Sequence, residues 1–299
     1  MSGPVILTLI AAAGLSQDEI AAASAALNAV GGAITAEIAF DPPCAVDLVV
    51  RGLSREAARA AAEAVPGSFD VVAQGAGPWR QKQLLLADMD STMIGQECID
   101  ELADFAGRKA EIAAITEAAM RGELDFASAL DARVASLAGL AESAIATCLA
   151  ERIVLTDGAR TLVRTMQLRG CRTVLVSGGF TAFTAEIAGR IGFDHQVANI
   201  LHLADGALVG TVARPIVDGQ VKRATLVAER EALGLPAEAT LAVGDGANDI
   251  PMLQEAGLGV AYHAKPRAAA AADAAIRYGD LRTLLWAQGI GRSEWVEAE

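Results

Sequence analysis

The sequence predicts an α/β protein in two parts: a small α+β unit, then a larger unit with a mostly parallel sheet and an inserted helical segment. Three observations lead to this fold class. Residues 4–74 alternate short apolar strands with alanine-rich helices. Beyond residue 82, apolar runs without alternation recur between helical patterns, which is typical of parallel strands buried on both faces. The stretch 97–152 contains helical patterns and no candidate strand. The length of 299 residues fits two domains.

The first unit is expected to alternate strands and helices. Ser16 and Ser54 stand at the two predicted helix starts, and Gly31-Gly32 and Pro66-Gly67 follow the predicted helix ends. The expected elements are a strand at 5–10, a helix at 18–30, strands at 33–40 and 45–51, a helix at 54–65 and a strand at 69–73. This β-α-β-β-α-β order is the ferredoxin-like arrangement. It resembles the topology of ACT-type regulatory modules, which accompany amino-acid enzymes. Because the unit carries no ligand motif, a packing or dimerising domain stays open as the alternative.

A linker is expected at Gln74–Gln81, where glycine and proline interrupt the periodic pattern. It divides the chain into domains 1–76 and 77–299. The second domain is expected to contain a Rossmannoid sheet with strands at 83–87, 173–176, 196–199, 240–243 and 258–261. Two segments depart from this pattern: a helical insertion at about 95–155, and a β-hairpin at 201–212 with Asp205-Gly206 at its turn.

Composition argues against several kinds of partner and location. The formal net charge of −13 argues against a nucleic-acid backbone or an anionic membrane, because both require clustered Lys and Arg. No apolar run reaches the roughly 18 residues of a spanning helix. No Lys or Arg precedes the first apolar segment, so that segment is not expected to be a signal peptide. The four cysteines lie far apart without metal-binding spacing, so reduced thiols in a cytoplasmic protein are expected.

Polar clusters follow three of the predicted parallel strands. They are DMDST at 88–92, SGGF at 177–180 and GDGAND at 244–249. Because ligands bind at the carboxyl ends of the strands in an open parallel sheet, we expect these clusters to lie together. Each is weak evidence alone, since a helix cap, a strand-to-helix turn or an Asx turn would explain it.

Together, and with Lys222 between the second and third clusters, these motifs resemble those of the haloacid-dehalogenase-type phosphatases. Within that superfamily the chain closely resembles the phosphoserine phosphatases from about residue 83 to 262. The segments MRGELDF at 120–126 and LDARV at 130–134 look like that family's helical cap. The resemblance implies hydrolysis of O-phospho-L-serine to L-serine and phosphate, the last step of serine biosynthesis, through an aspartyl-phosphate with one Mg²⁺ per site. Whether the chain forms a homodimer is left open by the sequence.

The chemistry of phosphoryl transfer suggests roles for the charged residues. Asp88 is the predicted nucleophile, and Asp90 the predicted general acid and then base. A hard cation is expected between Asp88 and the phosphate, with Asp88 and Asp245 as side-chain ligands. The resemblance adds the backbone carbonyl of Asp90. Asp249 is expected to orient metal-bound water or Lys222, or to bind the metal directly. Lys222 is expected to screen the repulsion between Asp88 and the phosphate, and a nearby cation to keep the pKa of Asp88 low.

The expected substrate contacts come from the strand ends and from the insertion. They are Glu97, Met120, Phe126, Arg133, Ser177, Gly178, Gly179, Lys222 and Asn248. Ser177 and the two glycine N–H groups are expected to hold phosphoryl oxygens. The resemblance implies that Glu97 binds the ammonium group of the substrate and that Arg133 binds its carboxylate. It also implies that Met120 and Phe126 cover the site. Ordinary helix-surface charge is the alternative explanation for Glu97 and Arg133.

Two other functions stay open at this stage. One is a phosphatase or phosphotransferase acting on another small phosphomonoester, such as phosphohomoserine. The other is an amino-acid-sensing regulatory protein. The intact set of Asp88, Asp90, Lys222 and Asp245 argues against the second, because a sensor does not need it.

Overall fold

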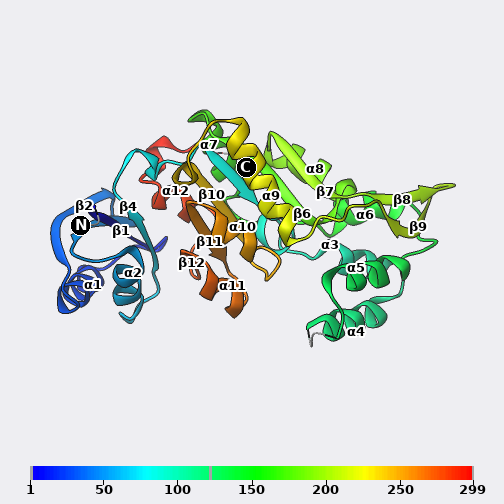
Figure 1. The fold of residues 1–299 in the computed structure, drawn as a ribbon, viewed down its shortest axis with the longest axis horizontal. Coiled ribbons are helices and arrows are strands. Elements are labelled where there is room, and N and C mark those ends of the chain that lie inside the picture. The colour runs from blue at the N-terminus through cyan, green and yellow to red at the C-terminus, as the bar shows by residue number, and fades with distance from the viewer. Residues whose placement is uncertain (1–2, 121–122, 298–299) are drawn as a thin grey trace.

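The computed structural model describes residues 3–120 and 123–297; the side chains of residues 119 and 120 lie outside this description. Figure 1 shows three parts along the long axis of the molecule. A small sheet with two helices stands at one end, and a larger sheet with helices on both faces lies in the middle. A group of helices and a β-hairpin form the other end.

The N-terminal part is a four-stranded antiparallel sheet in the order β2-β3-β1-β4. Its elements are β1 (Val5–Ile10), α1 (Gln17–Ala29), β2 (Ala33–Asp41), β3 (Ala45–Arg51), α2 (Arg55–Glu63) and β4 (Asp70–Gly75). The side chains of Ser16 and Ser54 cap α1 and α2, as predicted. The apolar faces of both helices share one buried core with Leu7, Leu9 and Leu48. The predicted β-α-β-β-α-β fold is confirmed.

The middle part is a six-stranded parallel sheet in the order β12-β11-β10-β5-β6-β7. Its strands are β5 (Leu84–Ala87), β6 (Arg172–Phe180), β7 (His195–Asn199), β10 (Thr240–Gly244), β11 (Leu258–Tyr262) and β12 (Ala274–Ile276). One face carries α7 (Ala159–Leu168), α8 (Thr181–Ile191) and α12 (Thr283–Ala287); the other carries α9 (Gly219–Ala232), α10 (Ile250–Glu255) and α11 (Pro266–Ala271). Leu85 and Ala87 face the core under α7, α8 and α12, whereas Leu84 and Leu86 face the core under α9, α10 and α11. The predicted Rossmannoid sheet is therefore confirmed.

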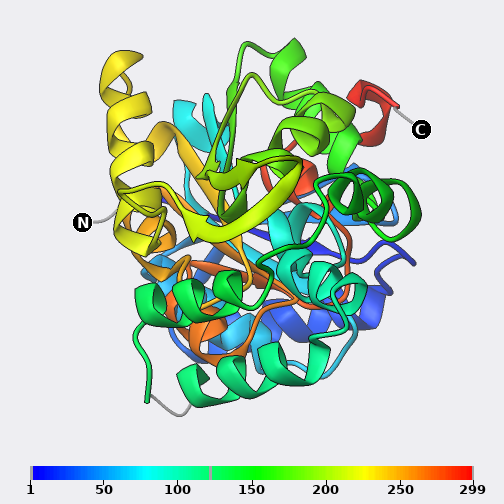
Figure 2. The ribbon, with the colours of Figure 1, turned by 90° about the vertical axis from the view of Figure 1, so that its right-hand side faces the viewer.

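The helical insertion follows β5, as predicted. It contains α3 (Cys98–Phe105), α4 (Lys109–Met120), α5 (Phe126–Ala135) and α6 (Ser143–Glu151). The predicted hairpin is also present, as β8 (Leu201–Ala204) and β9 (Ala207–Val212). The backbone of Leu208 in β9 bonds to that of Gly139 and Leu140, at 2.8 Å each, which joins the hairpin to the insertion. In Figure 2, this end of the molecule faces the viewer.

The structure departs from the sequence prediction in three places. β6 continues through the SGGF motif, because Phe180 pairs with Asn199 after a register shift. Gln74, predicted to begin the linker, belongs to β4, which pairs with β1 as far as Gly75. β12 was not predicted, because three residues with two alanines give no strand signal. Short helical turns lie at Pro78–Arg80, Met89–Met93, Ala237–Ala239 and Arg292–Glu294.

Polar contacts dock the N-terminal sheet on the C-terminal segment. The buried carboxylate of Asp70 accepts hydrogen bonds from the backbone N–H groups of Arg277, Tyr278 and Gly279, at 2.7, 3.2 and 2.8 Å. Arg80 lies 2.7 Å from a carboxylate oxygen of Asp47. These contacts hold the two sheets together. The domain limits at residues 76 and 77 stay a prediction.

Two predictions from composition can be compared with the structure. No helix in the described ranges combines the length and the apolar character needed to cross a membrane. The four cysteines, Cys44, Cys98, Cys148 and Cys171, are buried free thiols. A cytoplasmic location stays a prediction.

Candidate active site

Three parallel strands end side by side at one edge of the middle sheet. Ala87, the last residue of β5, pairs with Val243 of β10 and with Leu175 of β6. The three polar motifs follow these positions, so register alone brings Asp88, Asp245 and Ser177 to the same edge.

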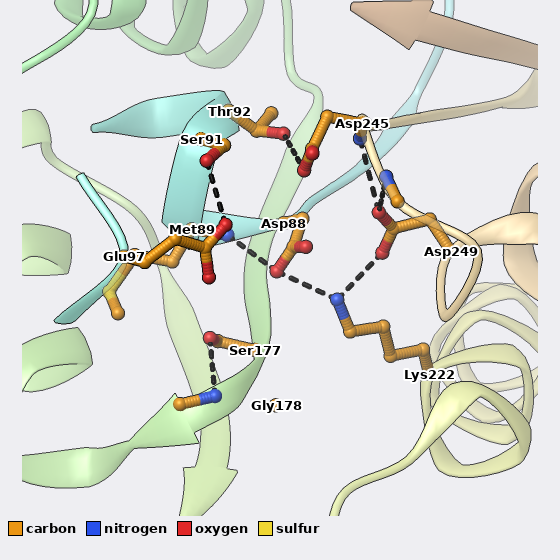
Figure 3. A network of polar contacts seen from close by, with 12 residues as sticks. Asp88, Met89, Ser91, Thr92, Glu97, Ser177, Gly178, Lys222, Asp245 and Asp249 are labelled. Carbon is orange, nitrogen blue, oxygen red and sulfur yellow. Dashed lines mark hydrogen bonds and ion pairs between the residues drawn. The ribbon is translucent and has the colours of Figure 1, made fainter. Parts of the chain in front are cut away.

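A buried chain of charged contacts crosses this edge (Figure 3). Nζ of Lys222 lies 2.7 Å from Oδ1 of Asp88 and 2.7 Å from Oδ1 of Asp249. The side chain of Lys222 is fully buried, and Asp88 is 4% exposed. Lys222 comes from the first turns of α9, which packs Lys222 and Leu226 against the sheet. Lys222 is therefore part of the site and not a solvated surface lysine.

Asp249 fixes the loop that carries Asp245. Its Oδ2 accepts hydrogen bonds from the backbone N–H groups of Asp245 and Gly246, at 3.1 and 2.9 Å. A Cβ atom on Gly244 would lie 2.4 Å from Cγ of Asp249, so only glycine fits there. Both oxygens of Asp249 are thus engaged by Lys222 and by the loop.

Asp245 meets two residues to which the sequence analysis gave no role. Oγ1 of Thr92 lies 3.4 Å from its Oδ1, and Nζ of Lys265 lies 3.4 Å from its Oδ2. The backbone N–H of Lys265 also donates to the carbonyl of Asp245, at 3.1 Å. Thr92 lies within the DMDST motif, so its proximity to the site could have been predicted from the sequence. Lys265 follows β11 without any motif, so only the fold reveals it.

The acidic cluster carries more negative charge than its lysine balances. Burial raises the pKa of Asp88, Asp249 raises it further, and Lys222 opposes them only in part. The expectation that a nearby cation keeps this pKa low is therefore wrong for Lys222 acting alone. Burial also raises the pKa of Asp245, again with a contribution from Asp249.

The same cluster fits a hard divalent cation. One carboxylate oxygen from each of Asp88, Asp245 and Asp249 lies within 4.8 Å of the others, and all three residues are buried. Carboxylate oxygens are the ligands that Mg²⁺ prefers, and a divalent cation would offset the unbalanced charge.

Asp90 faces the site from the turn after Asp88. Burial raises the pKa of Asp90 to about 7, with a further contribution from Glu97, while hydrogen bonds from Cys98 oppose the shift. Its Oδ1 is buried without a hydrogen-bond partner. A carboxyl group of this pKa with a free oxygen can donate and accept a proton near neutral pH.

Ser177 and the two glycines form the corner opposite the acidic cluster. Oγ of Ser177 accepts a hydrogen bond from the N–H of Gly179 at 2.8 Å. A Cβ on Gly179 would lie 3.3 Å from Oδ2 of Asp90, so a side chain there would crowd the site. Asn199, which the sequence analysis did not single out, donates from Nδ2 to the carbonyl of Gly178 at 2.8 Å. Its position at the end of β7, a predicted parallel strand, could have indicated that it lies near the site.

Glu97 is tied to the turn that follows Asp88. Ser91 donates from Oγ to Oε1 of Glu97 at 2.8 Å (Figure 3). Ser91 adopts a positive φ of 55°, a strained conformation for a non-glycine residue. The turn thereby holds the Glu97 carboxylate beside Asp90, whose pKa it raises.

The remaining residues of the insertion lie over the site to different extents. The Phe126 ring lies against Gly178, since a Cβ there would be 3.2 Å from Cζ of Phe126. Arg133 is half-buried, and burial lowers its pKa against the charges of Asp100, Glu97 and Asp90. The charges of these carboxylates therefore act on Arg133, while its Nε donates a hydrogen bond to the carbonyl of Ala129 at 3.3 Å. Met120 ends α4, and its side chain lies outside the described residues.

Asn248 lies in the loop between Asp245 and Asp249. Its Oδ1 lies close to Gly246, because a Cβ there would be 2.4 Å from it. The residue is half-buried. It is thus placed at the rim of the site.

Comparison with known proteins gives a consistent result. The profile of the haloacid dehalogenase-like hydrolases matches residues 85–254. A phosphoserine phosphatase of Mycobacterium tuberculosis is 47% identical over 220 residues, which are 74% of this chain and 53% of that protein. A phosphoserine phosphatase of Polaromonas is 48% identical over 208 residues, which are 68% of this chain and 88% of that protein. The chain therefore spans about half the length of the mycobacterial relative and most of the other.

A solved structure resembles the whole chain. The structure described as a probable phosphoserine phosphatase from Vibrio cholerae superposes with a TM-score of 0.76 at 29% identity. The match covers 96% of this chain and 86% of that one. The similarity therefore extends over the N-terminal sheet as well as the parallel sheet.

Proposed function

Since the chain belongs to the haloacid dehalogenase-like hydrolases, we propose that it hydrolyses O-phospho-L-serine to L-serine and phosphate. The observation that carries this proposal is the buried Asp88–Lys222–Asp249 chain beside Asp245. A carboxylate beside a protonated lysine and a candidate cation site supports phosphoryl transfer. The substrate is supported by the relatives described as phosphoserine phosphatases and by the charges of Glu97 and Arg133 near the site.

In the proposed first step, an oxygen of Asp88 forms a bond to phosphorus while the bond from phosphorus to the serine oxygen breaks. Asp90 gives its proton to the departing oxygen. The raised pKa of Asp90, about 7, supports a carboxyl group that is still protonated near neutral pH. The first step leaves an aspartyl-phosphate on Asp88 and releases L-serine.

In the second step, Asp90, now ionised, takes a proton from water. The water oxygen forms a bond to phosphorus, and the bond from phosphorus to Asp88 breaks. Phosphate leaves, and both carboxyl groups return to their starting states. Lys222 stays protonated throughout, because Asp249 and Asp88 raise its pKa by more than burial lowers it.

We propose Mg²⁺ as the cofactor. Asp88, Asp245 and the backbone carbonyl of Asp90 are its proposed protein ligands. A bound Mg²⁺ would supply positive charge against the repulsion between the Asp88 carboxylate and the phosphate. Because both oxygens of Asp249 are already engaged, we assign it to holding Lys222 and the Asp245 loop.

The proposed substrate contacts divide into two groups. Ser177, Gly178, Gly179 and Lys222 would hold the phosphoryl oxygens. Glu97 would receive the ammonium group and Arg133 the carboxylate, with Phe126, Met120 and Asn248 around them. The burial that lowers the pKa of Arg133 supports a guanidinium that gains from a carboxylate ligand.

The test is phosphate release from a panel of phosphomonoesters with and without Mg²⁺. O-phospho-L-serine is expected to give the highest kcat/KM, above phosphohomoserine and p-nitrophenyl phosphate. Higher activity on another member of the panel would move the assignment to that substrate. Absence of phosphate release from every member would overturn the enzymatic proposal.

A further inference from the structure

A cavity of about 500 Å³ lies at the junction of the N-terminal sheet and the middle sheet. Its walls come from the connection between β4 and β5, from the start of α2, and from the loops before β10 and β11. The side chains that matter here are Arg55, Gln74, Trp79, Lys82 and Glu238. Lys82 precedes β5, whereas Asp88 follows it, so the cavity is at the opposite end of this strand from the candidate active site.

Lys82 is the unusual residue in this wall. It is only 7% exposed, and its Nζ donates to the backbone carbonyl of Glu238 at 2.8 Å. Within the described ranges no carboxylate lies at ion-pair distance from it. Burial, and then the charge of Arg55, lower the pKa of Lys82 to about 8, while the more distant charges of Asp273 and Glu238 oppose the shift. The ammonium is therefore still mostly protonated at neutral pH. Buried ammonium groups normally have an anionic partner.

Arg55 adds a second cation to the same wall. Its guanidinium has no ion pair among the residues that the structure describes. Its positive charge is close enough to lower the pKa of Lys82. The facing carboxylate of Glu238 is exposed. The buried Oε1 of Gln74 has no hydrogen-bond partner, although the Nε2 of the same side chain donates to Ala287 at 2.8 Å. The cavity wall therefore has unused polar groups, with positive charge in excess.

The geometry points to a binding site for a small organic anion, with its carboxylate or phosphate group held by Lys82 and Arg55. A cavity of this volume is in the range of sites for small molecules, which often lie between domains, and is large for an inorganic ion alone. Trp79 is half-buried in the wall and offers a flat apolar surface for the rest of the ligand. The guanidinium of Arg55 can pair with either anionic group through two parallel hydrogen bonds.

Such a ligand would contact both sheets at once. Arg55 and Gln74 belong to the N-terminal sheet and its helix, while Lys82 and Glu238 flank β5 and β10. Binding would stabilise the docked arrangement by mass action, without competing with a substrate at Asp88.

The test uses benzoate and phenylphosphonate as probes, one for each anionic group, on the full chain in EDTA. Isothermal titration measures affinity for wild type, Lys82→Met, Arg55→Gln and the control Lys109→Met, which alters an exposed lysine of α4. A fourth variant, Ser177→Ala, weakens anion binding at the candidate active site. At least one probe is expected to bind wild type with Kd of about 1 mM or tighter.

The variants should differ in their affinity for that probe. Lys82→Met and Arg55→Gln should each weaken binding about tenfold or more. Lys109→Met and Ser177→Ala should leave it unchanged.

The proposal fails if neither probe binds wild type, or if both cavity variants bind as tightly as wild type. It also fails if Ser177→Ala alone removes binding, because the anion then sits at the active site. Should Lys82→Met not fold, Arg55→Gln decides, since Arg55 is exposed and its replacement leaves the core intact. The probe that binds more tightly identifies the anionic group. Phosphatase activity without probe should stay unchanged in Arg55→Gln, which separates this proposal from that of the catalytic site.

Discussion

Lys222 of α9 and Asp249, the residue before α10, form a fully buried ion pair of 2.7 Å, and the same ammonium group lies 2.7 Å from Asp88. Asp249 in turn receives the backbone N–H groups of the loop that carries Asp245. A displacement of Lys222 would therefore disturb the proposed nucleophile, Asp88, and the proposed metal ligand, Asp245, together. The predictions below test this arrangement and the substrate contacts around it.

The first prediction concerns the nucleophile. Asp88→Asn should remove phosphate release, because an amide oxygen is too weak a nucleophile to attack phosphorus. The fold should remain, as checked by circular dichroism. Asp205→Asn, at the exposed turn of the hairpin, is the matched control and should keep wild-type kcat. Normal turnover by a folded Asp88→Asn protein would refute the assignment.

The second prediction concerns the buried lysine. Lys222→Met leaves Asp88 and Asp249 without their common partner, so the free energy of unfolding should fall by about 3–5 kcal/mol in urea denaturation without metal. Arg223→Met is the control on the same helix. Its guanidinium pairs with Glu255 at the surface, and its loss should cost at most about 1 kcal/mol. Equal losses in the two variants would show that the buried pairs add no stability.

The third prediction concerns the metal. Activity should stop in EDTA and return with Mg²⁺, whereas Ca²⁺ should support it poorly, because Ca²⁺ is larger and accepts more ligands. Mg²⁺ should also raise the free energy of unfolding, by about 2.7 kcal/mol at a hundred times its Kd. Asp245→Asn should lose most of this stabilisation. Full activity in metal-stripped protein, or an equal effect of Mg²⁺ on wild type and Asp245→Asn, would contradict the proposed site.

The fourth prediction concerns substrate selectivity. Glu97→Gln and Arg133→Ala should each lower kcat/KM for phosphoserine by about 10- to 150-fold, because each removes a hydrogen bond to a charged group. The loss on p-nitrophenyl phosphate should be much smaller, since that substrate has neither an ammonium nor a carboxylate group. Arg108→Ala, on the exposed side of the insertion, is the control. Similar losses on both substrates would mean that Glu97 and Arg133 support the insertion rather than bind the amino acid.

The fifth prediction concerns the N-terminal domain. A chain that starts at Gln81 should keep its phosphatase activity, because all candidate catalytic residues lie beyond that point. It should unfold at a lower temperature, since it loses the Asp70 contacts and exposes the apolar surface around Leu284 and Trp286. Calorimetry and the phosphate assay measure the two effects. Loss of activity in a folded, monodisperse truncated protein would show that the domain contributes to the site.

The positions of Asp88, Ser177 and Asp245 could be predicted from sequence because each lies just beyond an apolar run that forms a parallel strand, and these runs are in register at one edge. The role of Lys265 could not, because it approaches the site only through the packing of β11 and lies in no motif. Asn199 lies in no motif either, and only its position at the end of β7 pointed to it. Without a metal ion, Lys222 alone does not keep the pKa of Asp88 low, because burial and the proximity of Asp249 raise it; both are properties of the packed structure that a spacing in sequence does not report.

The strand β12 and the extension of β6 show the same limit in the fold. Ala274–Ile276 has little strand propensity, and it is a strand because β11 offers an open edge. The glycines of the SGGF motif predict a turn, but the motif belongs to β6, because Phe180 pairs with Asn199 of β7. In both places tertiary pairing decided the local structure.

The bonds of Asp70 also bear on how the chain folds during synthesis. Its backbone partners follow it by 207 to 209 residues, so they are synthesised long after Asp70 itself. N-terminal domains generally fold first as the chain emerges. The small sheet can therefore fold before residues 277–279 have been synthesised, and its docking face stays exposed until then.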